Sequence, residues 1–135
     1  MGRPLLILLD THVVVWLAGD EMRLSKTARA AIENARQAER GMAISDFTLY
    51  ELSTLFRKKE IGLVGSLESF LSEVEKRFVV LPITSRICVG ASSLPGGYPK
   101  DPADRIIGAT ALVNGLTLVT ADAQIRKSRA IPTIW

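Results

Sequence analysis

The sequence lacks several patterns that define common enzyme classes. Its 135 residues include one cysteine, Cys88, so no internal disulfide can form, and a reducing cytosol is the natural setting. Cys88 stands in an apolar stretch, where a small buried side chain is expected. There is no GxxxxGK[ST] loop, no GxGxxG turn and no CxxC pair. These absences argue against nucleotide-loop, dinucleotide, and thiol or zinc chemistry, which leaves carboxylate chemistry.

Long apolar runs are also missing. No segment approaches the ~20 apolar residues of a membrane helix, and the apolar run at 5–9 meets the charged Asp10 at once, unlike that of a signal peptide. We therefore expect a cytoplasmic protein without a membrane partner. A hydrophobic content of 47% over this length predicts one domain, 1–135. The net charge of +3 permits an anionic partner without requiring one.

Short apolar segments alternate with amphipathic ones along the chain. Strands are predicted at 5–9, 42–44, 78–81, 116–119 and 131–134. Helices are predicted at 11–17, 25–40, 45–59, 66–76, 84–94, 101–113 and 123–129. The order β-α-α-β-α-α-β-α-α-β-α-β predicts an α/β fold of three layers, in which helices flank a mostly parallel sheet of four to five strands.

Four acidic residues follow the predicted strands. In such folds the ligand site lies outside the carboxyl ends of the strands, near the point where the strand order reverses. Asp10 and Asp122 come just after strands, Glu51 lies in the first turns of the helix after the second strand, and Asp104 lies in the first turn of its helix. We therefore expect the four carboxylates to meet at one edge, where they suit a hard cation such as Mg²⁺ or Mn²⁺.

Each acid also has an ordinary structural alternative. Asp10 and Asp101 can cap helices, Asp104 can favour a helix N-terminus or pair with Lys100, and Asp122 can be a turn residue. Glu51 can complete a capping box with Thr48. The sequence leaves these alternatives open, although four coincident placements are harder to explain than one.

Polar neighbours and basic groups complete the set of candidates. Thr11 and Thr120 can hydrogen-bond the acids, while His12, the chain's one histidine, excludes a two-histidine ribonuclease mechanism and is expected to be structural. With four Phe, two Tyr and two Trp, no platform for stacking bases is evident. Clusters of lysine and arginine can contact a phosphate backbone, and the candidate RNA contacts among them are Arg29, Arg36, Arg57 and Lys58.

Four segments in order resemble one known family. They are LLDTHVVVW (8–16), ISDFTLYEL (44–52), KDPADRIIGATA (100–111) and LTLVTAD (116–122), and the chain closes with IPTIW. Together they look like the PIN-domain toxins often called VapC, over essentially the whole chain. The resemblance implies Mg²⁺- or Mn²⁺-dependent endonucleolytic cleavage of RNA, a homodimer, and a small antitoxin encoded alongside. The family's metal-binding acids match Asp10, Glu51, Asp104 and Asp122, with Asp101 a candidate fifth member, for one or two ions.

Three other functions fit the sequence less well. A haloacid-dehalogenase-like phosphatase needs a second Asp two residues after Asp10, where this chain has His12. A phospho-receiver domain needs an Asp at the end of the third strand, where Pro82 and Ile83 follow instead. A catalytically silent binding module with a PIN-like fold is the main alternative, and the presence of all four acids argues against it.

Overall fold

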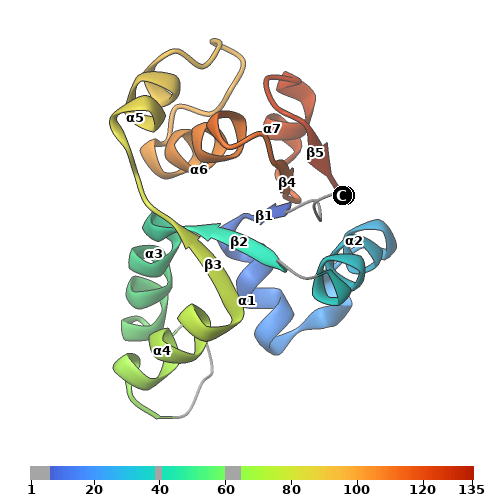
Figure 1. Cartoon of the computed structure of the whole chain (residues 1–135), viewed down its shortest axis with the longest axis vertical. Coiled ribbons are helices and arrows are strands. Elements are labelled where there is room, and N and C mark those ends of the chain that lie inside the picture. Colours follow the sequence, from blue (N-terminus) through green and yellow to red (C-terminus); the bar gives the residue numbers. More distant parts are fainter. Residues whose placement is uncertain (1–6, 39–40, 60–64) are drawn as a thin grey trace.

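The computed structural model describes residues 7–38, 41–59 and 65–135. Their centre is a parallel sheet made of β1 (Ile7–Leu9), β2 (Met42–Ser45), β3 (Phe78–Leu81), β4 (Thr117–Val119) and β5 (Thr133–Ile134). The strand order is β3-β2-β1-β4-β5, and every neighbouring pair is parallel (Figure 1). The chain thus builds outward from β1 on one side and then returns to add β4 on the other, which places the reversal of strand order between β1 and β4.

Helices cover both faces of this sheet. They are α1 (Thr11–Gly19), α2 (Lys26–Gln37), α3 (Asp46–Arg57), α4 (Leu67–Arg77), α5 (Ser85–Ser92), α6 (Pro102–Val113) and α7 (Ala123–Ser128). Side chains of β1 alternate between two cores: Ile7 and Leu9 pack with residues of α1 to α4, and Leu8 packs with residues of α6 and α7. Figure 1 shows these two helical layers on opposite sides of the sheet. The predicted three-layer α/β fold is confirmed.

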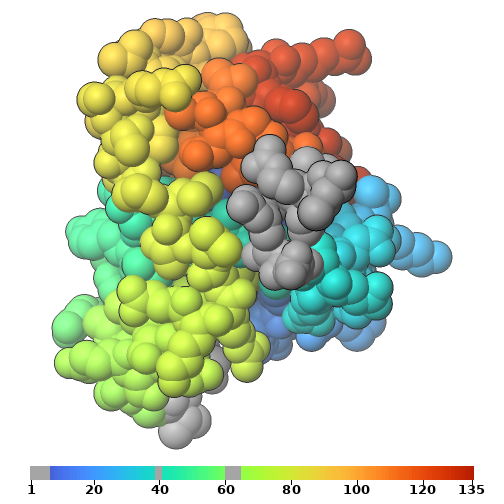
Figure 2. Space-filling model, viewed as in Figure 1, coloured from blue at the N-terminus to red at the C-terminus, as the bar shows by residue number. Residues whose placement is uncertain are grey.

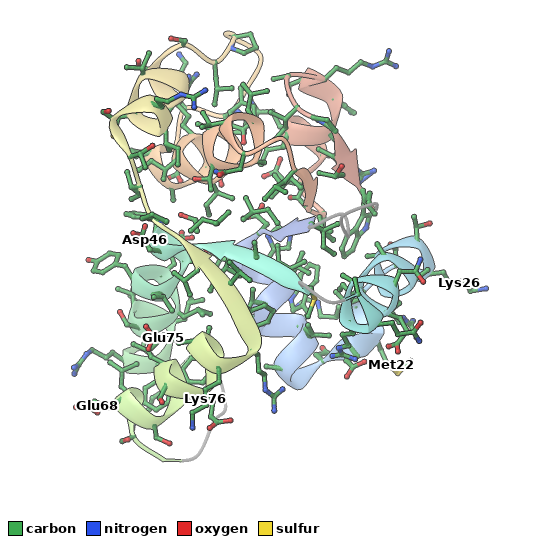
Figure 3. The ribbon with its side chains drawn as sticks, in the orientation of Figure 1. Met22, Lys26, Asp46, Glu68, Glu75 and Lys76 are labelled. Atoms are coloured by element: carbon green, nitrogen blue, oxygen red, sulfur yellow. The ribbon has the colours of Figure 1, made fainter. Side chains whose placement is uncertain are left out.

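The predicted order of helices and strands is also confirmed, with shifts at the boundaries. Residues 5–6, predicted to begin the first strand, and residues 39–40, predicted to end a helix, lie outside the described residues. A short 3₁₀ helix at Glu21–Arg23 was not predicted. Asp46 ties the start of α3 to the segment after β3, because its Oδ2 accepts the Ile83 N–H at 3.2 Å (Figure 3).

The expectation that Cys88 is buried is wrong. Its side chain is exposed on α5, which packs against α6 through Ile87 and Ala91 and leaves its other side to solvent. Figure 2 shows the α5 segment, in yellow, at the outer surface of the molecule. In a short helix that packs on one side only, some apolar residues of the sequence remain exposed to solvent. Within the described residues, no helix has the length and apolar character needed to cross a membrane.

Candidate active site

Asp10 joins the ends of the two central strands. Its backbone is extended as it leaves β1, its N–H donates to the Val119 carbonyl at 3.1 Å, and its Oδ1 accepts the Thr11 N–H at 2.9 Å, which caps α1. Its Oδ2 accepts the Thr120 hydroxyl at 2.8 Å. The residue is only 5% exposed. Since both carboxylate oxygens already have donors, Asp10 is held in one orientation at the reversal of strand order.

Thr120 also connects Asp10 to Asp122. The Thr120 hydroxyl donates to Asp10 and accepts the Asp122 N–H at 3.1 Å. Asp122 in turn caps α7, since its Oδ1 accepts the Ile125 N–H at 2.9 Å. The structural alternative predicted for Asp122 was a turn residue, and it is in addition a helix N-cap. The hydrogen-bonded chain through Thr120 also fixes the backbone of Asp122 relative to Asp10.

Glu51 reaches the same edge from α3. The Thr11 hydroxyl donates to Glu51 Oε1 at 2.5 Å and lies 3.0 Å from the buried Thr48 hydroxyl. The alternative of a capping box formed by Thr48 and Glu51 is not supported, because Ser45 caps α3 by accepting the Phe47 N–H at 3.1 Å. Burial raises the pKa of Glu51, the Thr11 hydrogen bond opposes this rise, and the charge of Asp10 adds to it.

Asp104 lies in the first turn of α6. Asp101 caps this helix, since its Oδ2 accepts the Asp104 N–H at 3.2 Å, and Pro102 occupies the first turn, as predicted. Burial raises the pKa of Asp104, and the charges of nearby acids raise it further, to about 7 in all. These acids are Asp10, Asp101, Asp122 and Glu51. No ion pair between Asp104 and Lys100 is found in the described residues, so this alternative for Asp104 is not supported.

A buried tyrosine supports the backbone at Asp104. The Tyr98 hydroxyl donates to the Asp104 carbonyl at 2.8 Å, and the side chain of Tyr98 is fully buried. Gly108, one turn further along α6, makes the room, because a Cβ there would lie 2.0 Å from the Tyr98 oxygen. Sequence reasoning missed this pair, for which the glycine within an apolar helix was the available signal.

Three of the four predicted acids line one cavity. It measures about 270 Å³ and is lined by Asp10, Thr11, His12, Val15, Trp16, Glu51, Leu55 and Asp104. None of these lining residues is a lysine or arginine. Asp122 does not line the cavity, although its charge raises the pKa of Asp104. The cavity therefore concentrates negative charge at the carboxyl edge of the sheet, as the strand-end rule predicted.

The donor set suits a hard divalent cation. The cavity offers carboxylate oxygens from three separate elements, which are the ligands that Mg²⁺ and Mn²⁺ prefer. In the part of the chain described, no three His, Cys, Asp or Glu side chains converge closely enough to ligate one ion together. Because Mg²⁺ usually binds through one or two carboxylates and keeps several waters, the residues fit such an ion in a partly hydrated form.

His12 braces the two loops that carry the acids. Its Nε2 accepts the Ala121 N–H at 2.9 Å, so a neutral ring carries its proton on Nδ1, which lies 3.7 Å from Asp10 Oδ2. Burial lowers the pKa of His12, against the raising effect of Asp10. The ring therefore connects the start of α1 to the segment between β4 and α7, in keeping with the expected structural role.

The predicted RNA-contacting residues lie apart from this cavity. Arg29 and Arg36 are exposed on α2 and line other cavities, and Arg57 and Lys58 are exposed where α3 ends. The closer cation is Arg23, whose guanidinium carbon lies 4.4 Å from the centre of the Trp16 ring. Sequence reasoning missed Arg23, because its approach to Trp16 depends on the turn that the 3₁₀ helix makes after α1.

Known proteins share this architecture. The sequence model of the PIN domain matches residues 7–130. The chain is 36% identical over 131 residues to Ribonuclease VapC22 of Mycobacterium tuberculosis, which covers 96% of this chain and 98% of that protein.

Solved structures agree on the fold. VapBC2 from Rickettsia felis, bound to a DNA fragment from its promoter, matches with a TM-score of 0.70 and 17% identity, covering 96% of this chain and 97% of that one. A toxin–antitoxin complex from Klebsiella pneumoniae matches with a TM-score of 0.62 and 24% identity, covering 86% of each chain. With the acids at the carboxyl edge of a parallel sheet and a family match over most of its length, this chain belongs to the PIN-domain family.

Proposed function

We propose that this protein is a Mg²⁺- or Mn²⁺-dependent endoribonuclease, a hydrolase that cleaves phosphodiester bonds within RNA. The observation that carries the proposal is the cavity into which Asp10, Glu51 and Asp104 bring carboxylates without a lysine or arginine in its lining. The relative at 36% identity is named a ribonuclease, which supports RNA as the substrate. Since no lysine or arginine lining the cavity offsets the negative charge of these acids, a divalent cation would do so.

The proposed roles divide between ligands and the groups that hold them. Asp10, Glu51, Asp104 and Asp122 would hold the cation, one or two of them directly and the others through its waters. Thr120 orients Asp10 and Thr11 orients Glu51 through their hydroxyls, and Asp101 fixes the turn that presents Asp104. When bound, the cation makes an attacking water more nucleophilic and offsets the charge of the phosphate. Asp104, with its pKa raised to about 7, can carry or release a proton near neutral pH.

The proposed biological role is that of a toxin restrained by an antitoxin. Relatives of this fold were solved as VapBC and toxin–antitoxin complexes, which supports a small cognate antitoxin as partner. We further propose that the chain forms one domain over 1–135, assembles as a homodimer, and acts in the cytoplasm on cytoplasmic RNA.

The test is cleavage of single-stranded RNA by the purified protein, free of any partner. With Mg²⁺ or Mn²⁺ we expect internal cuts, and with EDTA none, because the carboxylates then lack their cation. Asp10→Asn should abolish cleavage while the circular dichroism spectrum and the melting curve show a folded protein. Cleavage that continues in EDTA would contradict the metal mechanism, and binding of RNA without cleavage under all conditions would favour a silent binding module.

A further inference from the structure

Arg23 lies beside the acid cavity, held against an aromatic ring. Its guanidinium carbon is 4.4 Å from the centre of the Trp16 ring, and Trp16 lines the cavity together with Asp10 and Glu51. The adjacent Met22, labelled in Figure 3, is 86% exposed at the outer surface.

The hydrogen-bond donors of Arg23 are available, unlike those of three other arginines, Arg29, Arg36 and Arg105. Arg36 pairs with Glu33 at 3.6 Å, Arg29 donates to the Leu24 carbonyl at 3.4 Å, and Arg105 donates to two backbone carbonyls. Among residues 7–38, 41–59 and 65–135, no ion pair or hydrogen bond occupies the Arg23 guanidinium. Stacking on Trp16 therefore orients the group while its N–H edge stays free for an external acceptor.

Trp16 is itself supported by neighbouring rings. Its centre lies 4.9 Å from that of His12, which is also on α1, and 5.8 Å from that of Trp135, which follows β5. Trp16 also packs against the main hydrophobic core. A guanidinium stacked on such a ring loses less freedom on binding a ligand than one on a mobile side chain.

We propose that Arg23, positioned by Trp16, binds an RNA phosphate that neighbours the one cleaved in the acid cavity. The inference rests on the proposed function. An RNA strand that reaches three carboxylates must bring adjacent phosphates close to them, and a cation at the rim offsets that repulsion. A guanidinium suits this task because its planar fork matches two phosphate oxygens, and such contacts position the strand without reading its sequence.

The test measures RNA binding separately from cleavage. All proteins carry Asp10→Asn and are assayed in EDTA, and binding of a short fluorescein-labelled single-stranded RNA is followed by fluorescence anisotropy at several NaCl concentrations. Adding Arg23→Ala should weaken binding about tenfold at low salt. It should also reduce the slope of log K against log[NaCl] by about 0.7, the value for one phosphate contact on a single strand.

Two further variants separate a specific contact from a general loss of charge. Arg77→Ala removes the same charge from an exposed residue that lines a different cavity and is not among the predicted RNA contacts, and it should leave the salt slope unchanged. Arg23→Lys keeps the charge and loses the planar fork, so the slope should persist while affinity falls. In the cleaving protein, Arg23→Ala should raise KM more than it lowers kcat.

The possible failures can be told apart. If the Asp10→Asn protein binds RNA and Arg23→Ala leaves both affinity and slope unchanged, the Arg23 contact is wrong while the proposed function stands. The same conclusion follows if Arg77→Ala lowers the slope as much as Arg23→Ala does. If RNA is neither bound by the Asp10→Asn protein nor cleaved by the protein with its native Asp10, the proposed function and this inference both fail.

Discussion

Asp104 is a single residue whose surroundings disfavour the charge that its proposed role needs. Burial and the nearby acids raise its pKa from the ordinary value of 3.8 to about 7. The folded protein therefore holds this proton more tightly than the unfolded chain does. As the pH rises from about 4 through about 7 the metal-free fold loses stability, and above that range the full penalty remains.

Asp104→Asn should therefore stabilise the metal-free protein. At pH 8 in EDTA we expect the Tm to rise by about 2–4 °C, and near pH 4 we expect almost no change. The same variant should lose cleavage and most of the stabilisation that Mn²⁺ gives. Thermal melts at both pH values, with EDTA and with Mn²⁺, provide the measurement.

Asp20→Asn is the matched control, because Asp20 is exposed and its side chain makes no capping hydrogen bond. It should show neither the pH-dependent stabilisation nor the loss of the Mn²⁺ response. If Asp104 serves only the helix N-terminus, Asp104→Asn would instead lower stability by about 0.3–1 kcal/mol and leave the metal response intact.

Among the helices, α6 shows how the carboxylate of Asp104, a proposed metal ligand, is placed with support from a buried side chain of the preceding loop. Tyr98→Phe removes the buried hydroxyl that donates to the Asp104 carbonyl. We expect a loss of about 1–3 kcal/mol in the free energy of unfolding, measured by urea denaturation, because a buried carbonyl loses its donor. Cleavage should fall as well, since the turn that presents Asp104 becomes less well fixed.

Tyr50→Phe is the control for this change, since Tyr50 is 62% exposed on α3 and its loss of a hydroxyl should cost little. Equal stability of Tyr98→Phe and the parent protein would show that the hydrogen bond does not support α6.

Some features of the helices and strands could be predicted from the sequence and others could not. The helix starts predicted at Ser66 and Asp101 are confirmed, because a cap and the N–H it accepts are separated by only three residues. Four acids were predicted to meet because parallel strands end at one edge, and three of them, Asp10, Glu51 and Asp104, line one cavity. The Thr11–Glu51 bond spans 40 residues, and the Arg23–Trp16 contact depends on an unpredicted turn. Such contacts arise from packing, which periodicity and local spacing do not encode.

At the scale of the whole molecule, the proposed toxin activity predicts an effect on living cells. Expression in a bacterium should arrest growth, and Asp10→Asn should relieve the arrest while the protein accumulates in soluble form. Growth curves with immunoblots of the soluble fraction measure both. Equal toxicity of the Asp10→Asn protein would indicate that harm comes from binding rather than from cleavage.

Four acids at the carboxyl edge of the sheet are proposed to form a metal centre. Electron paramagnetic resonance of Mn²⁺ titrated into the metal-free protein tests it most directly, because free and bound Mn²⁺ give distinct signals. We expect the parent protein to bind Mn²⁺ at pH 7.5, and Asp10→Asn, Glu51→Gln, Asp104→Asn and Asp122→Asn each to weaken binding at least about tenfold, whereas Asp20→Asn binds as the parent does. A parent protein that leaves Mn²⁺ free, or four variants that bind it unchanged, would contradict the claim.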